Sequence, residues 1–433
     1  MSIGLNRRGL APTKTAVFRV DAGPGIGMGH FMRCRTLALE LIRRKWVVFF
    51  VGSGLPKTII DNGNRRVNRI INLIEFGPFT TAAEDSRALL ELLTEKFDLL
   101  IDCLVIDTYF YNREDYAFFQ RFGRQRLPVL VIDDLASRDT PAQAVLNPNP
   151  LFPREPYERQ KIPCIMCGEE YTLIRPEVVE LRDRRYSEDG VITITLGGGD
   201  VVEPLIMVLS AVPDGLANRI CVSVSTNCPL DAINDWISRD PTRRFLNTDS
   251  DRFPELLASS AFAITGGGTT LWEAYCLGVP NLCLVWVDNQ RQTSVVIKQQ
   301  ATSFLIDFAE QINQGLQSEL FGRGIGLLKN GVEPESERRR RELQNQSATD
   351  VIRRDNTSFL VDNEGGAGCD FISGILKEFR NMPEQWQEMM RRQRALIDGG
   401  GAVRCADRLE NLVWQQVELL TSDWRKDFEN WSA

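Results

Sequence analysis

Three short apolar segments of this 433-residue chain each run directly into a glycine-rich loop. The loops lie at 21–30, 197–200 and 266–270, and the first and the last lead into runs with helical periodicity. The strands predicted from apolar runs include 16–20, 46–51, 99–106, 128–132, 191–196, 261–265 and 281–287. Strands that alternate with helices through short loops are typical of a parallel sheet with crossover helices. The chain is therefore predicted to be an α/β protein whose two halves share a strand, glycine loop and helix.

The length of the chain is enough for two or three domains. We expect an N-terminal domain at 16–180 and a C-terminal domain formed by 190–305 together with 367–425. Periodicity fades at 311–365, where a run of four arginines and a stretch rich in Gln, Asn and Ser indicate a solvated polar insertion. Three roles stay open for this insertion: a lid, a site for a protein partner, or a spacer.

Composition argues against several classes of protein. Asp and Glu outnumber Lys and Arg by 58 to 51, and a net charge of −7 disfavours a nucleic-acid binder or a binder of anionic membranes. No apolar run reaches the roughly 18 residues of a membrane span. The ten cysteines are spread evenly, and the single C-x-x-C at Cys164 and Cys167 lacks the second pair that a zinc site needs. We therefore expect a cytoplasmic protein.

His30 is the only histidine, and it ends the first glycine loop. One histidine excludes a multi-histidine metal site. A histidine at a helix N-terminus holds a proton less readily, so its neutral ring can act as a general base. A residue that merely caps the helix is the alternative. Cys34 can share a helix face with His30, but it continues the apolar stripe of Leu37 and Leu41, which favours packing over a Cys–His pair.

The loop at 266–270 is the strongest candidate for a phosphate site. Its glycines expose backbone N–H groups at the start of a helix, and that helix end attracts anions. Thr269 and Thr270 add hydroxyl donors, and the carboxylate of Glu273 can accept bonds from both hydroxyls of a ribose. The pattern predicts a nucleotide at the carboxyl ends of the strands. A structural turn capped by threonine is the alternative.

Other polar side chains follow predicted strands. These are Asp21, Asp107, Tyr109, Asp133 and Asp134. Residues at these positions face the ligand crevice of a parallel sheet, or they serve as caps and turn residues. Arg33, one turn into the first helix, can likewise face a phosphate or solvent.

The motifs together resemble one family of sugar-nucleotide enzymes. The matching segments are 19–34 with its GIGMGH loop, 105–109, 131–135, 168–177, 196–200, 266–273, 277–280 and 288–290, with a weaker match at 394–402. These segments are similar to the UDP-2,4-diacetamido-2,4,6-trideoxy-β-L-altropyranose hydrolases, the nucleotide-sugar hydrolases of pseudaminic acid biosynthesis. The resemblance covers about residues 17–305 and 367–412.

The resemblance implies a glycosyltransferase-B fold, in which two Rossmann-like domains face a cleft that holds the sugar nucleotide. It implies that His30 activates a water molecule, which displaces UDP from the anomeric carbon with inversion and without a metal or other cofactor. The products are then UDP and the free amino sugar. Two other functions remain open: an inverting glycosyltransferase on the same fold, and a non-catalytic protein that binds a nucleotide sugar.

The same resemblance implies a set of site residues. The catalytic group is His30, Tyr109 and Asp21. The substrate contacts are expected from Gly27, Gly29, Arg33, Gly198, Gly267, Gly268, Thr269, Thr270, Glu273, Asn289 and Gln290. The chain departs from the family in two places. It has Asp107-Thr108-Tyr109 where the family has Asp-His-Tyr, and typical members lack the insertion at 311–365.

Overall fold

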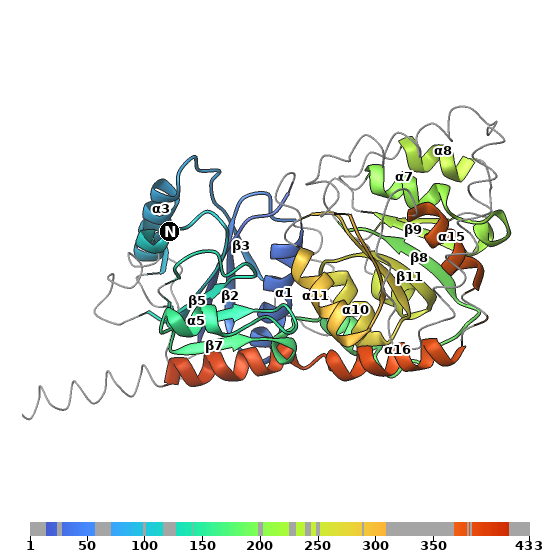
Figure 1. Ribbon diagram of the computed structural model, residues 1–433. Helices are drawn as coiled ribbons and strands as arrows, with labels where there is room; N and C mark the ends of the chain where they lie inside the picture. The colour runs from blue at the N-terminus through green and yellow to red at the C-terminus, as the bar shows by residue number, and fades with distance from the viewer. Residues whose placement is uncertain are drawn as a thin grey trace, which may run out of the picture. The chain divides into compact units, whose positions relative to one another are not determined.

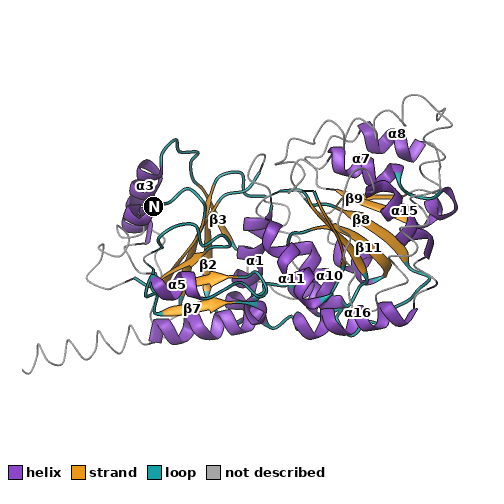
Figure 2. Cartoon of the chain, viewed as in Figure 1, coloured by secondary structure: helices purple, strands orange, loops and turns teal. Residues whose placement is uncertain are grey.

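The chain forms two compact α/β units in a computed structural model (Figures 1 and 2). The structure describes residues 14–23, 28–56, 71–97, 101–115, 127–140, 142–197, 202–224, 231–238, 244–247, 252–287, 290–308, 368–378, 381 and 383–414. The first unit comprises Met1–Arg175 with Gly399–Ala433, and the second comprises Pro176–Asp398. The predicted insertion at 311–365 lies outside the described residues.

The first unit is built on a seven-stranded parallel sheet with the strand order β3-β2-β1-β4-β5-β6-β7. The strands are β1 (Thr15–Val20), β2 (Val47–Gly52), β3 (Asn72–Glu75), β4 (Cys103–Asp107), β5 (Val129–Ile132), β6 (Ala144–Asn147) and β7 (Cys164–Cys167). Its helices are α1 (Gly29–Arg43), α3 (Ala82–Phe97), α5 (Glu155–Arg159) and the 3-10 turn η1 (Glu169–Tyr171). The central strands are buried along their whole length, as continuous apolar runs predict for a parallel sheet.

Helices cover this sheet because its two faces carry separate apolar cores. On one face Phe31 of α1 packs edge-on against Phe50 of β2, with ring centroids 5.7 Å apart. On the other face Phe97 of α3 meets Phe49 in the same way at 4.8 Å. Successive residues of a strand point to opposite faces, so Phe49 and Phe50 serve the two cores in turn.

The helix at 401–414 belongs to the first unit, whereas we expected it in the C-terminal domain. Its buried face joins the core formed by α1, β1 and β2, and contributes Cys405, Ala406, Leu409, Leu412 and Val413. Polar contacts also tie it there: Trp46 Nε1 donates to Glu410 Oε1 at 3.0 Å. An apolar stripe shows that one face of a helix is buried, but it carries no signal of which core that face joins.

The second unit is built on a six-stranded parallel sheet with the order β10-β9-β8-β11-β12-β13. The strands are β8 (Val191–Thr195), β9 (Ile220–Val224), β10 (Arg244–Asn247), β11 (Ser260–Gly266), β12 (Asn281–Val285) and β13 (Phe304–Asp307). The helical segments are α6 (Pro176–Val179), α7 (Val202–Ser210), η2 (Asp214–Arg219), α8 (Asp231–Ser238), α9 (Phe253–Ala258), α10 (Thr269–Leu277), α11 (Arg291–Gln300), α15 (Gly368–Glu378) and α16 (Pro383–Leu396). One core packs α7, α15 and α16 on this sheet.

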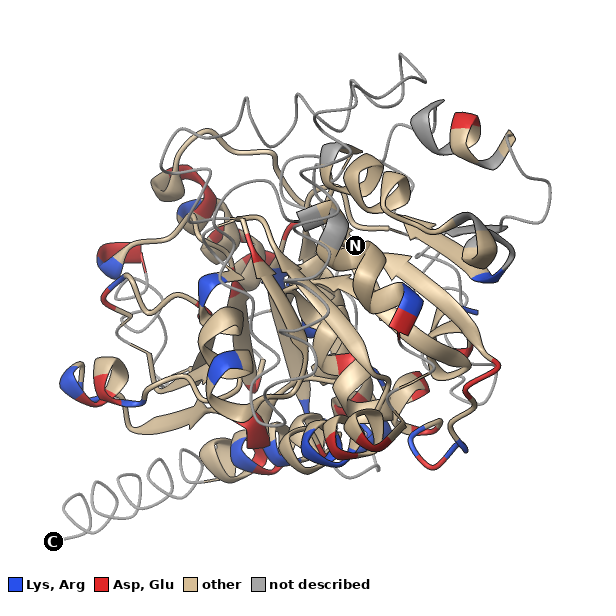
Figure 3. Ribbon diagram, turned by 45° about the vertical axis from the view of Figure 1, so that its right-hand side comes forward, with Lys and Arg blue, Asp and Glu red and all other residues tan. Residues whose placement is uncertain are grey.

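Helix α10 ends at Gly278, which has a left-handed conformation with φ of 71°. Glycine adopts this conformation without steric cost, which makes it suited to end a helix. On α16 acidic and basic side chains are interspersed (Figure 3), and Glu388 pairs with Arg391 and Arg392. Within the described part of the chain, no helix is both long and apolar enough to span a membrane.

Candidate functional site

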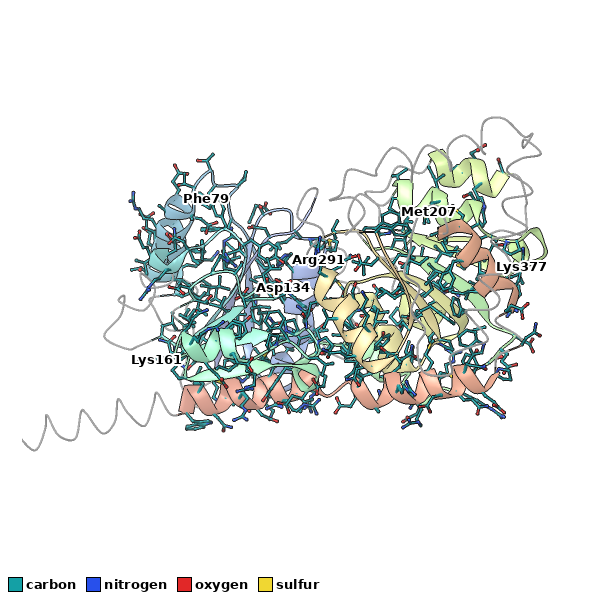
Figure 4. The ribbon with its side chains drawn as sticks, in the orientation of Figure 1. Phe79, Asp134, Lys161, Met207, Arg291 and Lys377 are labelled. Atoms are coloured by element: carbon teal, nitrogen blue, oxygen red, sulfur yellow. The ribbon has the colours of Figure 1, made fainter. Side chains whose placement is uncertain are left out.

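Side chains from three neighbouring strand ends of the first unit come together at the start of α1. His30 and Arg33 lie in the first turns of that helix, which follows β1. Asp107 is the last residue of β4, and Tyr109 lies two residues beyond it. Asp134 lies two residues beyond β5 and is labelled in Figure 4. Because β1, β4 and β5 are adjacent and parallel, their carboxyl ends bring these five residues, the His30 cluster, to one edge.

The carboxylate of Asp107 is the fully buried centre of the His30 cluster. It accepts hydrogen bonds from Arg33 Nε and Arg33 Nη2, both at 2.6 Å, and lies 2.6 Å from His30 Nδ1. Burial alone would raise the pKa of Asp107, but the positive charge of Arg33, the neighbouring His30 and their hydrogen bonds bring it well below its ordinary value. Asp107 is therefore a fixed, ionised acceptor at neutral pH.

This arrangement sets which ring nitrogen of His30 carries hydrogen. An ionised carboxylate can only accept, so the hydrogen between Asp107 and His30 sits on Nδ1. Arg33 Nη2 also lies 3.0 Å from Nδ1, but an arginine only donates, so this is a contact between two donors. The neutral ring then carries its lone pair on Nε2. We infer that Nε2 is the position from which His30 can accept a proton.

Arg33 links Asp107 to a second carboxylate, Asp134. Arg33 Nη1 donates to Asp134 Oδ2 at 2.7 Å, and the Tyr109 hydroxyl donates to Asp134 at 2.8 Å (Oδ1) and 2.9 Å (Oδ2). The Tyr109 ring meets the His30 ring edge-on, with centroids 4.8 Å apart. Tyr109 therefore contacts both Asp134 and His30. Burial, and then the charge of Asp134, raises the pKa of Tyr109 above its ordinary value. The phenol therefore stays protonated at neutral pH.

Cys34 lies against the same carboxylate but belongs to the core. Its side chain is fully buried beside Leu37 and Leu41, as the apolar stripe predicted. Its Sγ lies 3.4 Å from Asp107 Oδ2. Burial, and then the charge of Asp107, raises the pKa of the Cys34 thiol well above its ordinary value. A buried neutral thiol is a poor nucleophile, so the geometry favours packing over a Cys–His pair.

Asp21, predicted in the catalytic group, lies at the end of β1. Its Oδ1 accepts from Ser53 N at 2.8 Å and Ser53 Oγ at 3.1 Å, and it pairs with Arg19 Nη1 at 2.7 Å. Arg19 also donates from Nε to Asp85 at 3.0 Å. Among the described residues, the hydrogen bonds of Asp21 thus hold the ends of β1 and β2 together, and none of them joins it to the His30 cluster.

The second unit carries the glycine loop predicted to hold a phosphate. The loop runs from the end of β11 through Gly267 and Gly268 into α10. A Cβ on Gly266 would lie 2.6 Å from the carbonyl oxygen of Leu196, so the strands approach too closely there for any other residue. Thr293 Oγ1 donates to the Gly267 carbonyl at 2.8 Å and fixes the loop from α11.

The N-terminus of α10 is accessible. Gly268, the N-cap, offers no side-chain hydrogen bond to the helix, and both it and Thr269 are exposed. Thr270 is half-buried, and Glu273, one turn further on, is buried with 4 % of its surface exposed. Backbone N–H groups at the start of a helix suit an anion, and the phosphate site at this loop stays a prediction.

The structure describes some of the remaining predicted contact residues and not others. Gln290 lies beside the loop, because a Cβ on Gly267 would come within 3.2 Å of the Gln290 Cβ. Gln290 Oε1 also accepts from Trp286 N at 3.3 Å. Gly29 is the first residue of α1. Gly27, Gly198 and Asn289 lie outside the described residues.

Asp107 and Asp134 were not in the predicted catalytic group, although both follow predicted strands. Their positions at adjacent strand ends were the available signal. Their contacts with His30 and Arg33 depend on pairings across 74 to 101 residues of sequence, which no local pattern encodes. Across the described ranges, no group of three or more His, Cys, Asp or Glu side chains is arranged to hold a metal ion.

Sequence comparison finds a relative that matches part of the chain. No protein-family model matches the chain. A stretch of 151 residues is 28% identical to the spore coat polysaccharide biosynthesis protein SpsG of Bacillus subtilis. The stretch spans 34% of this chain and 44% of that protein, so less than half of the relative's length is matched.

Solved structures resemble the chain along most of its length. MurG of Acinetobacter baumannii is 12% identical, with 92% of this chain and 100% of that one covered and a TM-score of 0.50. The UDP-GlcNAc 2-epimerase of Neisseria meningitidis, solved with UDP-GlcNAc bound, is 12% identical over the same shares, with a TM-score of 0.52. At such low identity the likeness concerns the fold. With its two parallel sheets flanked by helices, the chain has the glycosyltransferase-B fold.

Proposed function

We propose that this chain hydrolyses a UDP-linked diacetamido-trideoxy sugar to UDP and the free amino sugar, with His30 as the general base. The observation that carries the proposal is the 2.6 Å contact between His30 Nδ1 and the buried, ionised Asp107. This contact directs the lone pair of a neutral imidazole to Nε2, at the edge of a parallel sheet where ligands bind. The similarity to SpsG and the UDP-GlcNAc in a structural neighbour support a sugar nucleotide as the substrate.

The nucleotide end of the substrate would bind at the glycine loop of the second unit. The exposed backbone N–H groups of Gly268 and Thr269 suit the diphosphate, and Glu273 suits the ribose hydroxyls. Donors aimed at the diphosphate stabilise the negative charge that builds up as UDP leaves. A leaving group stabilised in this way needs no strong general acid.

The chemistry balances with one water molecule. The water oxygen forms a bond to the anomeric carbon while one of its protons moves to His30 Nε2. The bond between the anomeric carbon and the β-phosphate oxygen breaks, and its electron pair leaves with UDP. Asp107 stabilises the imidazolium that forms, because its charge lies against Nδ1. Attack from the face opposite the leaving group inverts the anomeric centre.

The test follows UDP release by NMR from UDP-2,4-diacetamido-2,4,6-trideoxy-β-L-altropyranose in oxygen-18 water, without an acceptor. We expect the label on the anomeric carbon, and His30→Asn should lower kcat by about 10²–10⁴-fold, the usual contribution of a general base. Affinity for UDP, measured by calorimetry, should be unchanged in the variant.

Two outcomes would contradict this function. Release that requires an added sugar or lipid acceptor would indicate an inverting glycosyltransferase. Tight binding of the sugar nucleotide without release, with or without an acceptor, would indicate a non-catalytic binding protein.

A further inference from the structure

The hydroxyl hydrogen of Tyr109 is committed to Asp134. The Tyr109 oxygen lies 2.8 Å and 2.9 Å from the two carboxylate oxygens. A phenol has a single hydrogen to donate, and an ionised carboxylate has none. The Tyr109 oxygen is thus left with lone pairs only, and toward any further partner it can act only as an acceptor.

Arg33 keeps this polarity fixed. Its Nη1 donates to Asp134 Oδ2 at 2.7 Å, and its positive charge lowers the pKa of Asp134 against the effect of burial. Asp134 therefore stays ionised at neutral pH and cannot turn into a donor. Arg33 is itself 7 % exposed and is held from the other side by Asp107, so it has little freedom to release Asp134.

Tyr109 is also the most exposed member of the His30 cluster. It is 42 % exposed, whereas the His30 side chain is 12 % exposed and that of Asp134 is 18 % exposed. Its ring borders the His30 ring at 4.8 Å. A group bound beside His30 therefore lies within reach of the Tyr109 side chain.

We propose that Asp134 is a positioning residue that holds the Tyr109 oxygen as an obligate hydrogen-bond acceptor, so that the site selects a ligand with an O–H or N–H donor facing Tyr109. The inference rests on the proposed function, since it takes the bound sugar as that ligand. The hydroxyl and acetamido groups of an amino sugar are donors of this class. A sugar that presents only an ether or carbonyl oxygen there leaves two acceptors face to face, which costs binding.

The variant Asp134→Asn tests whether Asp134 fixes the hydrogen-bond polarity of Tyr109 or only supports the Tyr109 side chain. The asparagine side chain has nearly the same shape, and its Oδ1 can still accept from Arg33. Its Nδ2, however, donates to the Tyr109 oxygen, which turns the phenol hydrogen outward and reverses the polarity that the ligand meets. Tyr109→Phe removes the acceptor altogether. Asp139→Asn, on the same loop but 60 % exposed and paired with the exposed Arg113, is the matched control.

The experiment measures kcat and KM for the sugar nucleotide in the wild type, the two single variants, their double variant and the control. We expect Asp134→Asn and Tyr109→Phe each to raise KM about tenfold, the equivalent of one hydrogen bond, with a smaller change in kcat. In the Tyr109→Phe background Asp134→Asn should add less than about twofold, because the residue acts through Tyr109. If the KM increases of the two single variants multiplied in the double variant, the proposal would be overturned. A wild-type KM in Asp134→Asn would overturn it too.

A second measurement needs no turnover. In protein labelled with carbon-13 at tyrosine Cζ, the Tyr109 signal should keep its protonated shift up to a higher pH in the wild type than in Asp134→Asn, because the negative charge of Asp134 raises the pKa of the phenol. Identical titrations of Tyr109 in the wild type and in Asp134→Asn would contradict the influence of Asp134 on the phenol. If the chain binds the sugar nucleotide without hydrolysing it, the same variant cycle is measured as Kd, so failure of the proposed function and failure of this inference give different results.

Discussion

His30 and Asp107 are separated by 77 residues in sequence, and His30 Nδ1 lies 2.6 Å from Asp107 Oδ1. The pair forms because β1 and β4 are hydrogen-bonded neighbours, with Val20 in register with Asp107. The start of α1 and the end of β4 therefore meet at one edge. A buried, ionised carboxylate against one ring nitrogen leaves the lone pair of a neutral ring on the other nitrogen, and the proposed chemistry depends on this feature.

The first prediction concerns the tautomer of His30. In Asp107→Asn the amide can donate to Nδ1, which moves the ring hydrogen to Nε2 and removes the lone pair that would accept the proton of water in the proposed reaction. We expect kcat for UDP release to fall by about 10²–10⁴-fold. The affinity for UDP should be unchanged, since the glycine loop lies in the second unit. Rates within threefold of the wild type, in a variant with a native circular dichroism spectrum, would refute the assignment of His30 as the base.

The second prediction concerns stability and pH. Arg33→Met leaves the buried charge of Asp107 without its partner and should lower the free energy of unfolding by about 3–5 kcal/mol at pH 7. In the wild type the folded pKa of Asp107 is depressed. Its contribution to stability is thus complete above the ordinary value of 3.8 and is lost as the pH falls through the folded value.

In the variant, burial without Arg33 raises the pKa of Asp107, so protonation relieves the cost as the pH falls. The difference in unfolding free energy between wild type and variant should therefore shrink from pH 7 to pH 4. Urea denaturation at pH 7, 5 and 4 measures it. Arg113→Met, which breaks an exposed ion pair with Asp139, is the control and should cost less than about 1 kcal/mol at each pH. A pH-independent difference for Arg33→Met would contradict the account.

The sequence predicted the parts of this fold that depend on local pattern. The strand predicted at 16–20 is β1 (Thr15–Val20), and that at 261–265 is β11 (Ser260–Gly266). Both are mostly apolar runs that lead into glycine-rich loops, and this pattern depends on neighbours in sequence alone. Gly278 likewise ends α10, because its left-handed conformation favours glycine.

The sequence did not predict which side chains that are distant along the chain become partners in the fold. The ambiguity of Asp21 illustrates the point, because its partner Ser53 comes close only when β1 and β2 are side by side. Arg33 had two possible environments, phosphate or solvent, and instead it lies between two carboxylates. Charge and strand-end position alone cannot distinguish a residue that touches a ligand from one that fixes its neighbours.

The third prediction separates the two roles of glycine in the second loop. A Cβ on Gly266 would meet the Leu196 carbonyl at 2.6 Å, so Gly266→Ala should lower the free energy of unfolding by about 1–3 kcal/mol. A Cβ on Gly268 would meet no atom within 4 Å, so Gly268→Ala should fold normally. If a diphosphate approaches this backbone, the same Cβ holds it away from the N–H groups.

Calorimetry with UDP, together with urea denaturation, distinguishes these effects. Gly268→Ala should weaken UDP binding by about tenfold or more, which is about 1.4 kcal/mol, without a loss of stability. Unchanged UDP affinity in Gly268→Ala would show that the nucleotide does not bind at the start of α10. A fully stable Gly266→Ala would contradict the close approach of β11 to β8.

The last prediction concerns the helix at 401–414, whose place in the first unit differs from the sequence-based expectation. Leu409 is fully buried in the core shared with α1 and β2. Leu409→Ala should lower the free energy of unfolding by about 2–5 kcal/mol, because it leaves a cavity in that core. Asn411→Ala, at an exposed position two residues along the same helix, should change it by less than about 0.5 kcal/mol. Native-state hydrogen exchange locates the effect: amide protection should fall in β1 and β2 of Leu409→Ala and hold in β8 and β11. Loss of protection in β8 and β11 instead would place this helix with the second unit, as the sequence alone had suggested.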